Sequence, residues 1–154
     1  MMHVIIGVGP AGITAAQTIL KTDKDAQITM ISTDEFVHSR CMLHRYLSHE
    51  RNEETLSFVD KDFFSSNRIH WVKGVTVEKI DVDEKKVCLS NHEDYLFDKL
   101  LIATGANSFI PPVAQFREAK NVFGLRHLSD AQKIRPLADD ADHILVVGSG
   151  LVGM

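Results

Sequence analysis

The chain has 154 residues, of which 44% are hydrophobic and 25% charged, and this ordinary globular composition supplies enough apolar mass for one core. Its net charge of -4 and its pI near 6.0 provide no basic face for phosphodiester contacts, so we expect no nucleic-acid partner. No apolar stretch approaches the about 20 residues of a membrane span, and two cysteines do not make a secreted disulfide framework, so we expect a cytoplasmic protein with no membrane partner.

A strand, a glycine turn, a helix and a second strand follow one another at the start of the chain. Residues 3–6 are an apolar run that suits a buried parallel strand, and a glycine-rich turn occupies residues 7–12. Residues 13–21 are rich in helix formers with apolar side chains at helical spacing, and residues 27–31 predict the next strand. This order predicts one βαβ unit.

The middle of the chain changes from a helical to a strand-like pattern. Residues 32–66 are irregular, with helices predicted around residues 41–49 and 59–66. After residue 69 the apolar side chains alternate as in an antiparallel sheet. The segments with this alternation are Trp71-Val72, residues 75–80 and residues 86–89, and they are followed by a fully apolar strand at residues 100–103 that ends at Thr104-Gly105.

The last third contains a connector, a helix and a repeat of the opening pattern. Residues 107–125 form the connector, and a helix can start at residues 129–132, where Pro136 would kink or shorten it. Residues 143–153 then repeat the apolar strand and glycine turn of the N-terminus. We expect residues 143–147 to form a strand whose unpaired edge could mediate homo-oligomer formation.

The first glycine turn has the pattern of a dinucleotide-binding site. Gly7 would permit the tight turn out of the strand, Gly9 the close approach of a pyrophosphate to the helix N-terminus, and Gly12 the contact of helix and strand. An acid near the end of the second strand should bind the ribose, and Asp34 and Glu35 lie just past that strand. The alternatives are a turn that binds nothing and two solvated loop carboxylates.

Three segments together resemble the FAD-dependent pyridine nucleotide-disulfide oxidoreductase superfamily. These are the turn from Gly7 to Gly12, the Ala103-Thr104-Gly105 strand end and the second turn with Gly148, Gly150 and Gly153. The resemblance implies that Gly7, Gly9, Pro10, Ala11 and Gly12 bind the FAD pyrophosphate. It also implies that Ala103, Thr104 and Gly105 close over the flavin nucleotide, and that the second turn opens an NAD(P)-binding domain.

The segment after the second predicted strand resembles that of nitrite reductase large subunits, rubredoxin reductases and NADH oxidases. The match implies that Asp34 or Glu35 holds the ribose, that Arg40 lies on the FAD and that Arg45 stands near the flavin ring. The backbone of Val77 would meet the adenine. Ser32 occupies the usual position of the acid, and this departure leaves the choice of ribose ligand open.

Cys41 is a candidate redox cysteine. The resemblance to coenzyme A-disulfide reductases and NADH peroxidases implies a cysteine near this point at a helix N-terminus, where the thiolate is favoured. The alternative is a small apolar side chain at a helix start. Cys88 lies in an alternating strand and is interpreted as a packing residue, and the histidines lack the spacing of a metal site, so we expect no metal.

These observations predict an α/β chain with a Rossmann-like FAD-binding domain, a parallel sheet and a small antiparallel β insert. We expect an incomplete FAD-binding domain at residues 1–110, a connector and helix at 111–142, and the start of a truncated NAD(P)-binding domain at 143–154. The resemblance implies an enzyme that passes electrons from NAD(P)H through FAD to a protein, disulfide or oxygen-type acceptor. The alternatives are a stand-alone nucleotide-binding or interaction module without turnover, and an NAD-dependent Rossmann dehydrogenase, which the antiparallel insert opposes.

Overall fold

The computed structural model describes residues 1–113, 115–148 and 150, and these fall into two compact units. The sheet unit consists of Met1–Val37 and Val59–Gly105, and the helical unit consists of His38–Phe58 and the described residues from Ala106 onward. No helix in the described ranges is long and apolar enough to cross a membrane. The predicted α/β class, with a parallel sheet and a separate small antiparallel sheet, is confirmed.

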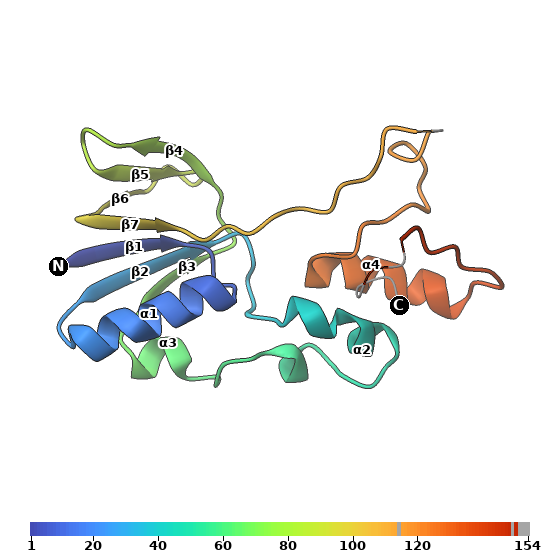
Figure 1. Cartoon of the computed structure of the whole chain (residues 1–154), viewed down its shortest axis with the longest axis horizontal. Helices are drawn as coiled ribbons and strands as arrows, with labels where there is room; N and C mark the ends of the chain where they lie inside the picture. Colours follow the sequence, from blue (N-terminus) through green and yellow to red (C-terminus); the bar gives the residue numbers. More distant parts are fainter. Residues whose placement is uncertain (114, 149, 151–154) are drawn as a thin grey trace. The chain divides into compact units, whose positions relative to one another are not determined.

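A four-stranded parallel sheet forms the centre of the sheet unit, in the order β3-β2-β1-β7 (Figure 1). Its strands are β1 (Met2–Ile6), β2 (Gln27–Ser32), β3 (His70–Lys73) and β7 (Lys99–Ile102). Helix α1 (Pro10–Thr22) connects β1 to β2 and makes the predicted βαβ unit. All four strands therefore end at the same edge of the sheet, which is where parallel α/β sheets bind their ligands.

Both faces of the central strands β1 and β2 are covered, which explains why these strands are mainly apolar without alternation. Successive side chains of a strand point to opposite faces. Ile5 and Met30 accordingly pack with Ile13 and Ala16 of α1 and with Phe63 of the short helix α3 (Phe63–Ser66), and all five side chains are buried. The opposite face belongs to a second apolar cluster, which reaches the antiparallel sheet.

The antiparallel sheet contains β4 (Val77–Asp81), β5 (Lys86–Leu89) and β6 (Asp94–Leu96), in that order. Its buried residues Val87 and Leu89 pack with Val4 and Ile6 of the parallel sheet. The sheet unit thus has three layers, with helices on one face of the parallel sheet and the antiparallel sheet on the other, as Figure 1 shows.

The interpretation of Trp71-Val72 as part of the antiparallel insert is wrong. Both residues lie in β3, where they pair in parallel with Met30 and Ile31 of β2. Alternation of apolar side chains reports only that one face of a strand is less buried than the other, so it could not assign this strand to a sheet. Residues 94–96 form the third antiparallel strand in its place.

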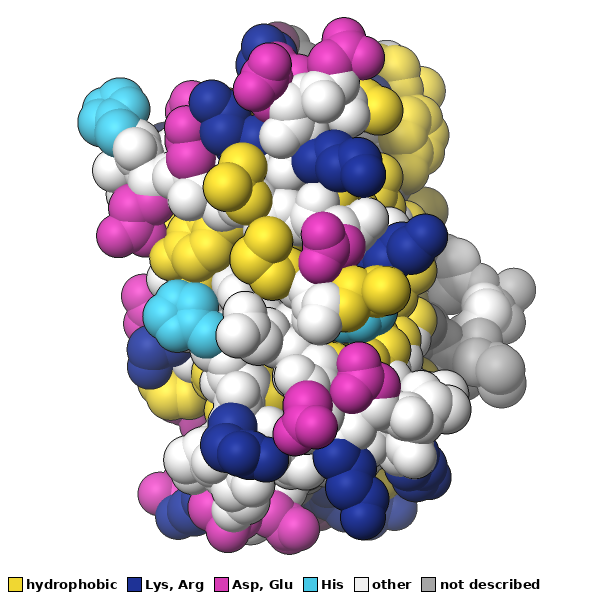
Figure 2. Space-filling model, turned by 90° about the vertical axis from the view of Figure 1, so that its left-hand side faces the viewer, with side chains coloured by type: hydrophobic (Ala, Val, Ile, Leu, Met, Phe, Trp, Pro, Cys, Tyr) yellow, Lys and Arg dark blue, Asp and Glu magenta, His cyan; other side chains and the backbone are white. Residues whose placement is uncertain are grey.

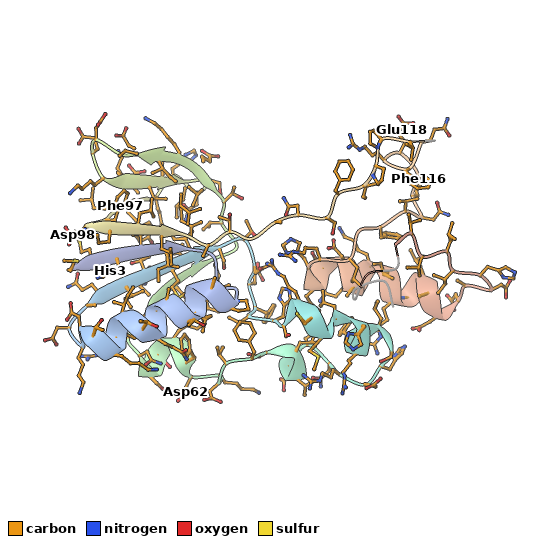
Figure 3. All side chains as sticks on the ribbon, viewed as in Figure 1. His3, Asp62, Phe97, Asp98, Phe116 and Glu118 are labelled. Carbon is orange, nitrogen blue, oxygen red and sulfur yellow. The ribbon has the colours of Figure 1, made fainter. Side chains whose placement is uncertain are left out.

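The start of β7 is attached to β1 by a pair of hydrogen bonds. The Asp98 backbone N–H donates to the Met2 carbonyl at 2.9 Å, and the Met2 N–H donates to the Asp98 carboxylate at 2.7 Å. Figure 3 shows Phe97 and Asp98 beside His3 at this end of the sheet. The Phe97 side chain is buried in the cluster between the two sheets. On the face in Figure 2, which is viewed from the side where β1 begins, acidic and basic side chains are interspersed.

The helical unit is held by a small apolar cluster. It contains the 3₁₀ helices η1 (Arg40–Met42) and η2 (Glu54–Leu56) and the α-helices α2 (Leu43–Leu47) and α4 (Leu128–Asp139). Leu43 and Tyr46 of α2, Leu56 of η2, and Leu128 and Ala131 of α4 are buried against one another. This cluster explains why α4 packs on α2, although the two helices are far apart in the sequence.

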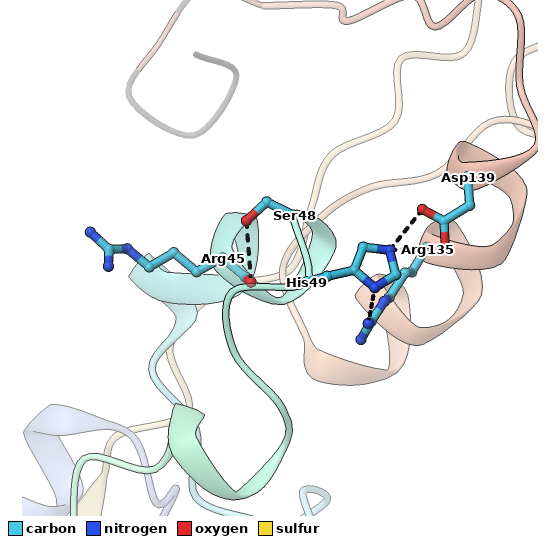
Figure 4. A network of polar contacts seen from close by, with 5 residues as sticks. All are labelled: Arg45, Ser48, His49, Arg135 and Asp139. Carbon is cyan, nitrogen blue, oxygen red and sulfur yellow. Dashed lines mark hydrogen bonds and ion pairs between the residues drawn. The ribbon is translucent and has the colours of Figure 1, made fainter.

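A polar network adds to the contact between α2 and α4 (Figure 4). The His49 ring contacts the Asp139 carboxylate at 2.9 and 3.0 Å through Nε2, and the Arg135 guanidinium contacts Nδ1 of the same ring. Arg135 also lies 4.7 Å from the centroid of the Tyr46 ring. About half of the His49 and Asp139 side chains is exposed, so this network contributes less than the buried cluster.

Several predicted elements have different bounds in the structure. The region 41–49 contains η1 and the five residues of α2, and the region 59–66 contains only the four residues of α3. Helix α4 continues for three residues past Pro136, so the proline does not end it. Residues 143–148 form no strand, because a strand requires a paired neighbour and they have none among the described residues.

The close contact of α1 with the preceding turn predicts a loss of stability in Gly12→Ala. A Cβ at Gly12 would lie 2.1 Å from the Gly7 carbonyl oxygen, which is backbone and cannot rotate away. We expect a decrease of about 1–3 kcal/mol in the free energy of unfolding, measured by urea denaturation. Gly9→Ala is the control, because a Cβ there meets no atom within 4 Å. Equal unfolding midpoints for the two variants would contradict this reading.

Candidate functional site

The first glycine turn joins the end of β1 to α1 and touches the end of β7. Gly7 has φ +115°, a backbone conformation that side chains disfavour. A Cβ at Gly7 would lie 2.2 Å from the carbonyl oxygen of Ala103, which follows β7. The Ala103 N–H in turn donates to the Ile6 carbonyl at 2.8 Å. The structure therefore brings the predicted residues Gly7, Gly12 and Ala103 together through contacts that leave no room for a side chain.

The N-terminus of α1 presents backbone donors with an open approach. Gly9 is the N-cap residue, Pro10 follows it, and the helical hydrogen bonds begin with the Ile13 N–H on the Gly9 carbonyl at 3.0 Å. The N–H groups of Ala11 and Gly12 precede that first bond and have no acceptor within the helix. The first turn carries no acidic side chain. Such a helix end attracts anions because its N–H groups and its dipole both favour negative charge.

The loop after β2 is tied to β3. Ser32, the last residue of β2, is buried, and its Oγ donates to the Asp34 carbonyl at 2.7 Å. The indole Nε1–H of Trp71 donates to the same Oγ at 3.0 Å. Asp34 is half-buried and Glu35 exposed, with the Glu35 carboxylate beside Gly74. Both acids predicted to bind ribose thus lie at the carboxyl edge of the parallel sheet.

Trp71 is a residue of this site that sequence reasoning did not identify. The hydrogen bond from its ring to Ser32 joins residues that are 39 positions apart, and no spacing in the sequence signals it. The one available signal was the serine at a position where an acid is usual. Val77, predicted to meet the adenine, is half-buried at the start of β4.

A shallow groove runs between α1 and β7 on the sheet unit. It is lined by side chains of α1 from Pro10 to Thr22 and by Leu101, Ile102 and Ala103, which are mainly apolar residues and threonines. Leu101 and Ile102 are 39% and 61% exposed, so the predicted apolar strand is an exposed edge of the sheet among the described residues. Gly105, with φ +70°, turns the chain after this strand.

The other predicted site residues belong to the helical unit. Arg40 begins η1 and is half-buried, and Arg45 of α2 is exposed and forms an ion pair with Glu50 at 3.6 Å. In the second glycine turn Gly148 has φ +122°, and a Cβ at Gly148 or Gly150 would meet no atom of the described residues within 4 Å. Gly153, also predicted to bind NAD(P), lies outside the described residues.

The two cysteines have different environments. Cys41 is exposed and lies in η1, one residue before the N-cap of α2. Cys88 is half-buried in β5, and its pKa is raised, first because its thiol hydrogen-bonds to Asp94 and second because it is partly buried. Lys86 lowers the pKa of Asp94, because its Nζ donates a hydrogen bond to the Asp94 carboxylate at 3.1 Å and favours the charged form.

The whole chain matches a known protein family. The model of the pyridine nucleotide-disulphide oxidoreductases matches residues 1–154. The assimilatory nitrate reductase electron transfer subunit of Bacillus subtilis is 28% identical over 153 residues, which are 98% of this chain and 20% of that protein. The rubredoxin-NAD(+) reductase of Pseudomonas putida is 28% identical over 156 residues, which are 100% of this chain and 40% of that protein.

The same likeness is found among solved structures. The NADH:rubredoxin oxidoreductase of Clostridium acetobutylicum superposes with a TM-score of 0.84 at 28% identity, over 99% of this chain and 39% of that structure. The chain therefore spans well under half the length of the relatives that it matches. The parts of those proteins beyond the match have no counterpart in these 154 residues.

The cysteine environments predict selective alkylation. At a mildly alkaline pH, Cys41 should react with iodoacetamide at least about tenfold faster than Cys88, because a raised pKa leaves less Cys88 thiolate and burial hinders access. Mass spectrometry of quenched time points measures both rates. In Asp94→Asn the pKa of Cys88 should fall, since the carboxylate that stabilises the thiol is gone. The alkylation rate of Cys88 should therefore begin to increase at a lower pH than in the unmodified chain, while the rate of Cys41 stays unchanged. Equal rates for the two thiols in the unmodified chain would refute this assignment.

Proposed function

We infer, from the premise that the chain belongs to the pyridine nucleotide-disulphide oxidoreductase family, that it forms the FAD-binding portion of an NAD(P)H-dependent flavoprotein oxidoreductase. The observation that carries this inference is the open helix N-terminus at Gly9, set at the carboxyl edge of the parallel sheet two residues after Gly7, which packs on Ala103. Relatives named for rubredoxin reduction support a protein acceptor. The acceptor of this protein is proposed only as a protein, disulfide or oxygen-type electron acceptor.

The residues of the sheet unit fit the pyrophosphate of FAD. Gly9 has extended backbone, and the space above it is open, so a phosphate can approach the N–H groups of Ala11 and Gly12 without meeting a side chain. At Gly7 and Gly12, by contrast, the space that a side chain would need is filled by backbone. The turn therefore separates two tasks, since Gly7 and Gly12 pack the chain and Gly9 admits the ligand.

The remaining contacts follow the order of the strands. We expect the Asp34 carboxylate to accept hydrogen bonds from the ribose hydroxyls, with Glu35 as the second candidate, and the Val77 backbone to meet the adenine. Ala103, Thr104 and Gly105 would lie along the nucleotide past the end of β7. Bound FAD would supply the hydride acceptor, and the protein supplies position and electrostatics.

The basic and redox residues are proposed for the flavin end. Arg40 and Arg45 would contact FAD and the region of its ring, and exposed Cys41 is the candidate for thiol chemistry with a disulfide acceptor. Gly148 and Gly150 are proposed for NAD(P)H binding, because the second glycine turn repeats the sequence pattern of the first. The activity of the complete protein, including NAD(P)H turnover, is part of this proposal.

Gly9→Val tests the proposed FAD site. The branched side chain enters open space, so the unfolding midpoint should fall only by the modest amount expected for valine at a helix N-cap, but it blocks the approach of the pyrophosphate. We expect FAD affinity, measured by quenching of flavin fluorescence, to fall by about tenfold or more, which corresponds to ~1.4 kcal/mol.

Thr14→Val is the matched control for this experiment. It places the same branched side chain five residues further along the chain, where Thr14 of α1 is exposed, and FAD affinity should not change. A Gly9→Val chain that binds FAD as tightly as the unmodified chain would exclude the proposed site, as would an unmodified chain that binds none.

A further inference from the structure

We propose that Trp71 and Ser32 are positioning residues that hold Asp34 for recognition of the nucleotide ribose. This inference rests on the proposed function, in which the Asp34 carboxylate is the ribose ligand. It concerns how the fold places that acid two residues beyond the end of β2, when the strand itself ends in a serine.

The Ser32 hydroxyl both donates and accepts a hydrogen bond within the protein. It donates its single proton to the Asp34 carbonyl at 2.7 Å, and it accepts the indole proton of Trp71 at 3.0 Å. A carbonyl can only accept and an indole N–H can only donate, so the direction of both bonds is fixed. With the Ser32 side chain only 7% exposed, this hydroxyl has no proton left for a ribose and instead fixes the backbone of Asp34.

The indole that donates this bond is itself held firmly. Trp71 lies in β3, where it pairs with Met30 of β2, and its ring stacks on Phe64 with centroids 4.3 Å apart and planes 20° apart. The ammonium of Lys73 lies 5.7 Å from the centroid of the Trp71 ring. The Trp71 ring therefore has little freedom to turn, and its Nε1–H donates to Ser32 from a fixed position. This hydrogen bond holds the loop after β2 at a fixed place relative to β3.

The backbone at the end of β2 is fixed from two directions as well. The Gly7 N–H donates to the Ile31 carbonyl at 2.8 Å, which ties the strand end to the first glycine turn. The Val75 N–H donates to the Ser32 carbonyl at 3.1 Å, which ties it to the segment between β3 and β4. The loop that carries Asp34 thus starts from a backbone position that is fixed relative to the pyrophosphate donors. The hydrogen bonds of the Trp71–Ser32 pair fix the backbone for two more residues, as far as Asp34.

At the ribose position, Asp34 therefore binds the ligand while Ser32 and Trp71 hold Asp34 in place. A carboxylate at the strand end would be held by the sheet ladder itself, whereas Asp34 lies two residues beyond the end of β2. The two successive hydrogen bonds from Trp71 through Ser32 to the Asp34 carbonyl fix its backbone there. A loop that is ordered before the nucleotide binds does not have to be ordered at the expense of binding free energy.

Trp71→Phe is the decisive variant, because it keeps an aromatic ring beside Phe64 while it removes the N–H donor together with the second ring of the indole. Isothermal titration of the full chain with ADP and with 2′,3′-dideoxy-ADP gives the ratio of the two affinities. We expect the unmodified chain to prefer ADP by about tenfold or more, and Trp71→Phe and Ser32→Ala each to reduce this preference by about fivefold. The affinity for the dideoxy nucleotide should change less than about twofold.

Four further variants separate positioning from stability. Phe64→Leu removes the stacked ring but keeps the indole N–H, and it should lower the unfolding midpoint while the ADP preference remains. Asp34→Asn should abolish the preference, and the double variant Trp71→Phe, Ser32→Ala should lose no more than either single variant, because both break one relay. Glu35→Gln should leave the preference intact.

The outcomes that overturn the inference differ from the failure of the proposed function. An equal loss of affinity for both nucleotides in Trp71→Phe would show a merely structural role. A preference that depends on Glu35 and not on Asp34 would also overturn the inference. In both cases the unmodified chain still binds ADP, whereas a chain that binds neither nucleotide would refute the nucleotide site itself.

Discussion

The structure depends on a close approach of three backbone segments that only glycine allows. Helix α1 at Gly12, the turn at Gly7 and the chain after β7 at Ala103 pack against one another where a Cβ would stand 2.1 or 2.2 Å from a carbonyl oxygen. This contact sets how closely the N-terminus of α1 packs against the ends of the strands. The N-terminal amides of the helix, the end of β2 and the end of β7 then share one edge, and each later feature of the site is built outward from it.

The parts of the fold that follow from local sequence could be predicted. The βαβ unit has short apolar strands, a glycine turn and an amphipathic helix, and each of these carries its own pattern over fewer than about 15 residues. The segment at residues 100–103 was also recognisable as a strand, and β7 covers most of it. In the candidate site, the role of Gly7 as a turn residue follows from its place directly after β1.

The parts that depend on long-range pairing could not be predicted. Trp71 and Val72 alternate like their antiparallel neighbours, but the strand that they pair with is β2. Residues 143–147 have the composition of a strand, yet composition does not supply a partner, and four of their apolar side chains are more than half exposed. The bond from Trp71 to Ser32 depends on two strands coming into register, so nothing near either residue in the sequence announces it.

Strand β7 has a consequence for how this polypeptide behaves in solution. Among the described residues it pairs only with β1, and Leu101 and Ile102 on it are exposed. An outer strand with unpaired amide and carbonyl groups and exposed apolar side chains is a template for addition of another strand. Its single charged residue, Lys99, lies at the start of the strand and does little to prevent such pairing. The outer edge of β7 is therefore the place where copies of this chain can pair strand to strand as their concentration rises.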